Sequence, residues 1–313
     1  MCFGANRLVS FTVTILGSGS AVPTADRNPS SQYIECSGRT ILIDCGEGTQ
    51  MQFRKFGLKF QKVDLILISH LHGDHYFGLV GLLSTMHMMG RTRAIQIYGP
   101  IGLKDIVEIQ LHAAGSRLAF NVNIEEVEKE SNGVLFEDAK IKINYFPLAH
   151  KIPTSGFVIL QKEKERKLNI VKAKKDGVKI EYYHRLKKSE DVVDDKGEII
   201  RFEEYTDKGG SELSYAYCSD TKYHEPIIEF IKDVDTLYHE ATFLEAHEDR
   251  AKATKHSTAK HAAAIAELAN VRRLLMGHLS ARYSDGKEHE SEAQAIFANS
   301  IFVEDGTAYR IGE

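Results

Sequence analysis

The sequence of 313 residues predicts a soluble α/β sandwich, and three observations support this prediction. Hydrophobic residues make up 42% of the chain and charged residues 27%, which is typical of a globular protein that buries a core. Short β-rich runs are interspersed with segments whose apolar residues recur at helical spacing. No stretch approaches about 18 uninterrupted apolar residues, so the sequence predicts no ordinary membrane span.

The expected strands are short, and many end in Gly, Asp or His. They are Phe11–Leu16, Thr40–Asp44, Asp64–His70, Ala94–Tyr98, Lys140–Pro147, Phe157–Gln161, Ser214–Asp220, Thr236–His239, Arg272–His278 and Ala308–Ile311. The expected helices are Gly48–Phe56, His75–Met89, Gly102–Ala114, Pro226–Lys232, Ser257–Asn270 and Lys287–Ala298. Strands mixed in this way with helices of this length favour layers of helix and sheet packed around a common core.

Charge and cysteine content narrow the class of protein and its compartment. The formal net charge of −4 argues against an evenly basic nucleic-acid-binding protein, although it leaves room for a local basic patch. The four cysteines, Cys2, Cys36, Cys45 and Cys218, show no CxxC spacing, which favours reduced thiols over a disulfide framework. The first twenty residues have no basic segment ahead of a long apolar run, so we expect a cytoplasmic protein.

One segment departs from the strand and helix pattern. Residues Lys162–Lys188 contain eleven Lys or Arg against four Asp or Glu, a local charge of +7, whereas Glu190–Lys208 contains eight acids against three bases. Apolar periodicity is weak in both halves, which predicts an inserted arm. We therefore expect a catalytic domain formed by residues 1–161 and 211–313, interrupted by an arm at residues 162–210.

The strongest chemical signal is Ser69-His70-Leu71-His72-Gly73-Asp74-His75, which directly follows an apolar run. Imidazole and carboxylate groups at this spacing suit zinc, with manganese or iron as weaker rivals, because no thiolate joins them. His70 and His72 can bind one metal ion while Asp74 and His75 turn to a second. The alternative is a polar loop that caps the following helix.

Three further polar residues follow apolar strands. His150 comes after Pro147-Leu148-Ala149, Asp220 ends Tyr217-Cys218-Ser219-Asp220, and His278 ends Leu275-Met276-Gly277-His278. A single histidine is more often a satisfied structural residue than a ligand. The common placement of these residues after strands, together with the histidine cluster, nevertheless indicates a two-metal site in which the Asp220 carboxylate could bridge two cations.

The pattern His-x-His-x-Asp-His, followed by a spaced His, an Asp and a His, resembles the metallo-β-lactamase superfamily. Asp44, within Leu42-Ile43-Asp44-Cys45-Gly46, matches the first motif of that superfamily. The resemblance implies a four-layer αββα sandwich. It also implies that Asp44 supports the metal-binding loop through hydrogen bonds and does not itself bind metal.

Several further motifs resemble those of the transfer-RNA 3′-processing endoribonucleases, the tRNase Z family. They are Gly17-Ser18-Gly19-Ser20-Ala21-Val22-Pro23-Thr24, His239-Glu240-Ala241-Thr242-Phe243, His256-Ser257-Thr258-Ala259 and His278-Leu279-Ser280-Ala281-Arg282-Tyr283. The resemblance runs from about Leu16 to Tyr283. It implies an enzyme that removes the 3′ trailer from precursor tRNA and leaves a 3′-hydroxyl on the tRNA and a 5′-phosphate on the trailer.

The resemblance also implies a role for each site residue. Two Zn²⁺ ions are expected per chain, with Mn²⁺ as a substitute. One ion is expected on His70, His72 and His150 and the other on Asp74, His75 and His278, with Asp220 bridging. Asp74 can also take a proton from the attacking water. The acid for the leaving 3′-oxygen is expected to be His256, oriented by Glu240, although helix capping is the alternative for His256. His239 is expected to support the site or to be an ordinary buried strand histidine.

The arm differs from relatives, which usually carry a Gly-Pro-rich, lysine-bearing element there. Its basic residues nevertheless suggest RNA binding, and similar enzymes are homodimers in which one subunit's arm holds RNA at the other subunit's active site. The expected RNA-binding residues are Lys172, Lys174, Lys175, Lys179, Arg185, Lys187 and Lys188. The alternatives are a solvated arm without a ligand and a small-molecule metallo-hydrolase of the same superfamily, such as a phosphodiesterase, lactonase or thioesterase.

Overall fold

The computed structural model describes residues 11–162, 166–207 and 212–313, and within them the chain divides into two compact units. The larger unit contains the chain up to Leu160 and from Ser214 onwards, and the smaller unit spans Gln161–Leu213. The predicted end of the arm at Gly210 and the cysteine Cys2 lie outside the described residues. No helix in the described ranges has the length and apolar character needed to cross a membrane.

Within the described part of the larger unit, two seven-stranded sheets face each other. The first has the order β18 (Ala308–Arg310), β1 (Thr12–Gly17), β2 (Ser31–Cys36), β3 (Arg39–Ile43), β4 (Leu65–Leu67), β5 (Ile95–Pro100) and β6 (Val122–Val127). The second has the order β17 (Ser300–Phe302), β16 (Arg273–Gly277), β15 (Thr236–Glu240), β14 (Leu213–Cys218), β9 (Thr154–Gln161), β8 (Ile141–Leu148) and β7 (Gly133–Glu137).

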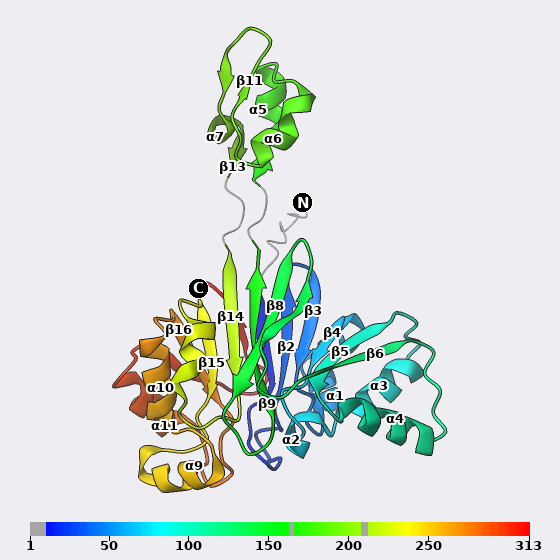
Figure 1. Cartoon of the computed structure of the whole chain (residues 1–313), viewed down its shortest axis with the longest axis vertical. Helices are drawn as coiled ribbons and strands as arrows, with labels where there is room; N and C mark the ends of the chain where they lie inside the picture. Colours follow the sequence, from blue (N-terminus) through cyan, green and yellow to red (C-terminus); the bar gives the residue numbers. More distant parts are fainter. Residues whose placement is uncertain (1–10, 163–165, 208–211) are drawn as a thin grey trace. The chain divides into compact units, whose positions relative to one another are not determined.

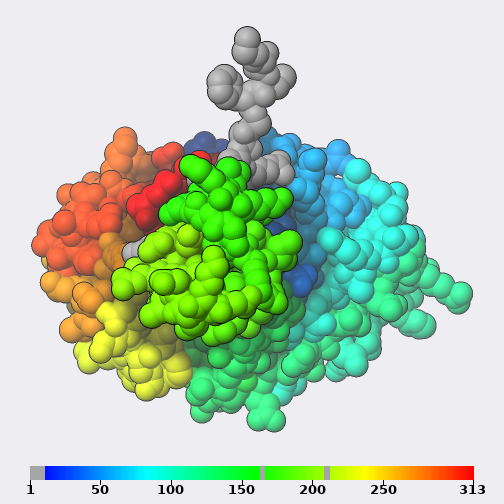
Figure 2. Space-filling view, turned by 90° about the horizontal axis from the view of Figure 1, so that it is seen from above, coloured from blue at the N-terminus to red at the C-terminus, as the bar shows by residue number. Residues whose placement is uncertain are grey.

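Helices cover the outer face of each sheet, which completes the four-layer αββα arrangement of the metallo-β-lactamase fold (Figure 1). Helices α1 (Thr49–Lys55), α3 (Leu79–Met88) and α4 (Leu103–Ala113) pack on the first sheet. Helices α8 (Ile228–Ile231), α10 (Ala259–Leu268) and α11 (Lys287–Gln294) pack on the second. In Figure 2 these two helical layers, cyan and orange, lie on opposite sides of the unit. The prediction of the fold is confirmed.

The two sheets contact each other through buried tyrosines. Tyr217 stacks against Tyr238, with ring centroids 5.2 Å apart, and its hydroxyl donates a hydrogen bond to Asp44 Oδ2 at 2.7 Å. Tyr215 donates to Gln32 of the opposite sheet. Each buried phenol therefore satisfies its hydroxyl while its ring fills the space between the sheets. The three described cysteines, Cys36, Cys45 and Cys218, are buried.

The structure divides the predicted helix His75–Met89 into α2 (Gly73–Tyr76) and α3. The break lies at Gly78, where a side-chain Cβ would approach the backbone oxygen of Gly46 to 2.2 Å. Glycine is required here because the two backbones approach so closely. The sequence did not predict strands β2, β6, β7 and β17, nor helix α9 (Glu248–Thr254).

The smaller unit has a hydrophobic core of its own, formed by Ala173, Val178, Leu186 and Val192. Its helices are α5 (Ile170–Lys175), α6 (Tyr183–Lys187) and α7 (Phe202–Tyr205), and two short ladders pair β10 (Lys167–Leu168) with β13 (Thr206–Asp207) and β11 (Val192–Val193) with β12 (Ile199–Ile200). Tyr182 and Tyr183 pack against this core. The segment that lacked clear periodicity is therefore a small folded module.

Candidate metal centre

Parallel pairing brings the predicted site residues to one edge of each sheet. In the second sheet, β14, β15 and β16 are parallel, and their register places Cys218 beside His239 and Glu240 beside Gly277. Asp220, Glu240 and His278 therefore lie at neighbouring strand ends. In the first sheet, parallel β3 and β4 end close together, just before Asp44 and His70. Residues far apart in sequence meet because the carboxyl ends of parallel strands share an edge.

Three of these residues adopt a backbone conformation that non-glycine residues rarely use. Asp44 has φ of 56°, Asp220 of 60° and His278 of 63°, all in the left-handed region. Such a conformation is strained for a residue with a side chain, by on the order of 1–3 kcal/mol each. The sequence nevertheless has a carboxylate or imidazole at each position, so the strain is accepted where the side chain meets the cluster.

Asp220 lies at the centre of the cluster, and its two carboxylate oxygens face two different groups of imidazoles. Oδ2 lies 3.6 Å from His70 Nε2 and 3.5 Å from His150 Nε2. Oδ1 lies 3.1 Å from both His75 Nε2 and His278 Nε2. The side chains thus separate into two sets that share one carboxylate.

The remaining ligand candidates complete these two sets. His72 Nδ1 lies 3.0 Å from His70 Nε2 and 3.2 Å from His150 Nε2. Asp74 Oδ2 lies 3.5 Å from His278 Nε2 and also accepts a hydrogen bond from the backbone of Ala21 at 2.8 Å. The structure therefore brings together all seven predicted ligand residues: His70, His72, Asp74, His75, His150, Asp220 and His278.

Two observations test whether this donor set fits metal ions. Nε2 of His75 and Nε2 of His278 are buried without a hydrogen-bond partner, although both point at carboxylates. In addition, nitrogens of three imidazoles converge on one point, an arrangement that a shared cation satisfies better than hydrogen bonds between rings. Burial lowers the pKa of His70, His72 and His150, which favours the neutral rings that metal binding needs. Nitrogen and oxygen donors without thiolate fit zinc.

Asp44 lies behind the cluster and fixes one ring. Its carboxylate accepts hydrogen bonds from Ser69 N at 2.7 Å, Ser69 Oγ at 2.9 Å and Tyr217 Oη at 2.7 Å, and it bonds His75 Nδ1 at 2.7 Å. Because Nδ1 of His75 is held in this way, Nε2 is turned toward Asp220. Such an outer carboxylate sets both the orientation and the tautomer of a ligating imidazole.

Glu240 forms a second buried carboxylate hub, next to His256. The carboxylate of Glu240 accepts hydrogen bonds from Thr221 N at 2.8 Å, Thr242 Oγ1 at 2.6 Å and Ser257 N at 3.1 Å. It also forms a hydrogen bond with His256 Nδ1 at 2.7 Å. Helix α10 (Ala259–Leu268) begins three residues after His256 and is capped by Thr258, whose side chain accepts a hydrogen bond from His261 N. The end of β15 and the start of α10 together hold the His256 ring beside the cluster.

The environment of His256 favours its charged form. Burial lowers the pKa of the imidazole, but the Glu240 carboxylate, with Asp220 and Asp74, outweighs burial and raises it to about 9. His239 behaves differently from its neighbour Glu240. Its Nδ1 bonds the backbone oxygen of Glu240 at 2.7 Å, and burial lowers the pKa of the ring. Within the described residues, His239 is not among the side chains that converge on the cluster.

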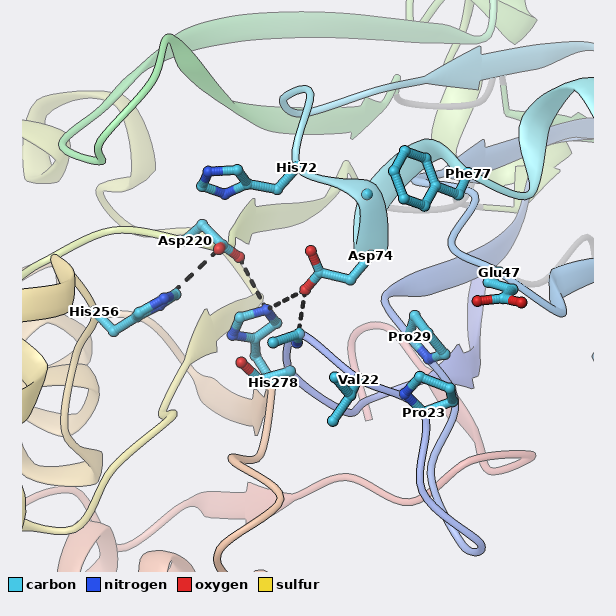
Figure 3. Close-up of a pocket in the computed structure, with 13 residues that line it drawn as sticks. Val22, Pro23, Pro29, Glu47, His72, Asp74, Phe77, Asp220, His256 and His278 are labelled. Carbon is cyan, nitrogen blue, oxygen red and sulfur yellow. Dashed lines mark hydrogen bonds and ion pairs between the residues drawn. The ribbon is translucent and has the colours of Figure 1, made fainter.

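The cluster opens into a cleft of about 510 Å³. Figure 3 shows His72, Asp74, Asp220, His256 and His278 around one space, with Phe77 on one side and Val22 and Pro23 on the other. The loop that carries Val22 and Pro23 belongs to the Gly-Ser-rich motif near the start of the chain. Sequence reasoning had not assigned Phe77 or Glu47, which also line this cleft.

The predicted RNA-binding residues all lie in the smaller unit, and several are paired with acids of the same unit. Lys179 forms ion pairs with Asp195 and, at 3.6 Å, with Glu181. Arg185 pairs with Glu190 at 3.0 Å. The acidic half of the segment thus offsets part of the charge of the basic half. These exposed pairs are weak, so they can exchange for other anions.

We compared the chain with family models and with known proteins. A family model described as anti-Pycsar protein Apyc1 matches residues 11–166. The chain is 42% identical over 297 residues to a ribonuclease Z of Bacteroides fragilis (strain YCH46), covering 94% of this chain and 97% of that protein.

Solved structures agree with this assignment. The short form of human tRNase Z superposes with a TM-score of 0.72 at 27% identity, covering 96% of this chain and all of that one. A metallo-β-lactamase fold protein of Bacillus subtilis superposes with a TM-score of 0.67 at 18% identity, covering 96% and 99% of the two chains. The second match shows the fold, and the first agrees with the sequence relatives. The chain therefore belongs to the ribonuclease Z family and has the metallo-β-lactamase fold.

Proposed function

We propose that this protein is a zinc-dependent endoribonuclease that removes the 3′ trailer from precursor tRNA. The products are a tRNA with a 3′-hydroxyl and a trailer with a 5′-phosphate. Membership of the ribonuclease Z family supports the substrate. The observation that carries the chemistry is the shared carboxylate of Asp220, whose two oxygens face two separate sets of imidazoles beside the His256–Glu240 pair.

Two Zn²⁺ ions are proposed for each chain, with Mn²⁺ as a substitute. His70, His72 and His150 would hold one ion, Asp74, His75 and His278 the other, and Asp220 would bridge both. When bound, the ions would supply the positive charge that activates water and neutralises the phosphate oxygens. The division of distances around Asp220 supports this assignment.

His256 is the proposed proton donor to the leaving 3′-oxygen. Its Nδ1 bonds Glu240, so its Nε2 remains to face the substrate. With a pKa raised to about 9, the ring is protonated at neutral pH, as an acid must be before the bond breaks. Cations bound at Asp220 and Asp74 would offset part of that rise, because they add positive charge near the ring.

Asp74 is the proposed acceptor of the proton from the attacking water. Burial raises the pKa of Asp74, but the neighbouring imidazoles of His75 and His278 outweigh burial and keep it low, so its carboxylate is ionised. The backbone N–H of Ala21 holds one carboxylate oxygen in place. Asp74 and His256 thus place a base and an acid in one cleft.

Recognition of RNA is proposed to involve the inserted arm, residues 162–210. Lys172, Lys174, Lys175, Lys179, Arg185, Lys187 and Lys188 provide its basic charge, which attracts the phosphate backbone. Lys172 Nζ also bonds the backbone oxygen of Glu204 at 2.9 Å. Since Tyr182 and Tyr183 pack on the core of the arm, their role is to stabilise it.

We also propose that the enzyme acts as a cytoplasmic homodimer. Exposed apolar side chains lie on α1 and at the end of α3, where Met51 is 62% exposed, Met88 75% and Met89 55%. Such a surface fits a second copy of the chain better than open solvent. In the proposed dimer, the arm of one subunit would hold RNA at the active site of the other. Light scattering on the eluting protein should give twice the mass of the chain.

The decisive experiment incubates the zinc-loaded enzyme with precursor tRNA labelled at either end and maps the cut. A single cut at the 3′ boundary of the tRNA, with a 3′-hydroxyl upstream and a 5′-phosphate downstream, is expected. A protein that holds two metal ions and hydrolyses a small phosphodiester, but leaves precursor tRNA intact, would instead be a small-molecule hydrolase.

A further inference from the structure

A second cavity, of about 460 Å³, adjoins the metal cleft, and the proposed function does not use it. Four segments of the larger unit line this cavity. They contribute Leu71 and His72, Pro100 and Ile101, Val127 and Lys129, and Ile152 and Pro153. His72 lines both this cavity and the metal cleft, so the two spaces adjoin at this residue.

The lining is apolar and part of it faces solvent. Six of the residues that line the cavity are Leu, Ile, Val or Pro. One of them, Ile101, lies in the turn after β5, and its side chain is 64% exposed. A large exposed aliphatic side chain at the mouth of an apolar cavity favours an apolar ligand with a flat or compact shape. Among the lining residues, Lys129 and His72 are the two with ionisable side chains.

Lys129 lies at the rim and pairs with its neighbour Glu130 at 3.1 Å, where both side chains are largely exposed, at 65% and 76%. An exposed pair of this kind contributes little stability, so a phosphate can replace the carboxylate. The cavity thus combines an apolar interior with a cation at its edge. A nucleotide has the matching combination of a flat base and an attached phosphate.

The position of the cavity relative to His256 decides which nucleotide fits. The ring of His150 lies between those of His72 and His256, with centroids 5.0 Å from each. Ile152 and Pro153 line the cavity and come two and three residues after His150 in the chain. His256 lines the metal cleft but is not among the residues that line this cavity, whereas His72 lines both. His256 is the proposed proton donor to the 3′-oxygen of the upstream nucleotide, so the upstream nucleotide would lie next to His256. The cavity would then accommodate the downstream nucleotide.

We propose that this apolar cavity binds the base of the first trailer nucleotide, the one that follows the cleaved bond. This inference rests on the proposed function, since it assumes cleavage of RNA with His256 as the acid. With few polar groups in the lining, contact with the base is through its face and is tolerant of sequence. Any base should serve, but the absence of a base should slow cleavage.

The test compares three precursor tRNAs under single-turnover conditions: an unmodified one, one with an abasic first trailer residue, and one with an abasic third trailer residue. Loss of the first base should slow the wild-type enzyme by roughly 10-fold, because the face of the base would no longer be buried against the apolar lining. Loss of the third base should change the rate less than about 2-fold. Equal rates on all three would overturn the proposal while leaving the proposed function intact.

A variant then links the effect to the cavity. Ile101→Ala should slow cleavage of the unmodified substrate by several-fold, and the same variant should match the wild type on the substrate without the first base. Ile109→Ala is the matched control, because Ile109 is 66% exposed on α4 and lies outside the cavity lining. Independent losses from Ile101→Ala and from removal of the base would also overturn the assignment. Failure of the wild type to cut the unmodified precursor would count against the proposed function instead.

Discussion

Replacement of His256 by alanine tests the proposed acid directly. The structure indicates that the variant will fold, because Glu240 keeps hydrogen bonds from Thr221 N, Thr242 Oγ1 and Ser257 N after the imidazole is removed. A buried carboxylate that stays hydrogen-bonded avoids most of the cost of losing one partner. Metal content should stay the same, since His256 is outside the proposed ligand set.

The expected loss follows from the chemistry of the leaving group. The Glu240 carboxylate outweighs burial and raises the pKa of His256, so the enzyme carries the protonated acid at neutral pH even though bound cations offset part of the rise. Removal of a positioned acid costs roughly 10²–10⁴-fold in rate, or about 3–5 kcal/mol of barrier. The loss should appear in kcat, with RNA affinity nearly unchanged, because the proton moves only in the transition state.

The assay compares precursor tRNA with a bis-nitrophenyl phosphodiester. A nitrophenolate leaves without acid help, so its release should fall less than about 10-fold in the variant. His112→Ala, at an exposed position on α4, is the matched control and should behave as wild type on both substrates. In the wild type, cleavage of precursor tRNA should decline at alkaline pH as the acid deprotonates. Equal losses on the two substrates would refute the role of His256 as the acid.

Three other predictions concern the metals, the arm and the fold. Asp220→Ala should release both ions, because one carboxylate faces both ligand sets; elemental analysis should find fewer than one ion per chain, and retention of two would rule out the bridge. Replacement of residues 162–210 by a short Gly-Ser linker should leave metal content unchanged, weaken RNA binding at least about 10-fold and flatten its salt dependence; an unchanged salt slope would exclude the arm as the RNA-binding element. Burial, with the nearby Arg27, lowers the pKa of His289 to about 4, so the unfolded state binds more protons below pH 6.5 and stability falls as pH decreases. Between pH 7 and pH 5, His289 should lower the free energy of unfolding by about 2 kcal/mol, as measured by urea unfolding. His289→Phe should therefore lose about 2 kcal/mol less than the wild type over this pH range, and identical pH profiles for the two proteins would contradict the assignment.

Local sequence alone was enough to predict the ligands in the segment from His70 to His75. They lie within six residues after an apolar strand, and this short spacing brings donors together whatever the rest of the chain does. Asp220 and His278 were predicted because each follows an apolar run, and Asp44 because it matches the first motif of the superfamily. Each of these residues comes just after a strand, and the neighbouring parallel strands end at the same edge of the sheet. The αββα fold was likewise predictable, since alternating strand and helix patterns and the family motifs span most of the chain.

Only the tertiary structure decided how these residues contact each other. The bond between Glu240 and His256 depends on where β15 ends and α10 begins, and adjacent residues His239 and Glu240 end in different surroundings. The bond from Tyr217 to Asp44 crosses between two sheets. The apolar cavity is assembled from four separate segments, and only the one with Leu71 and His72 belongs to a motif that the sequence shows. Spacing along the chain determines which donors are available, but side-chain contacts across sheets depend on packing, and packing is a property of the whole fold.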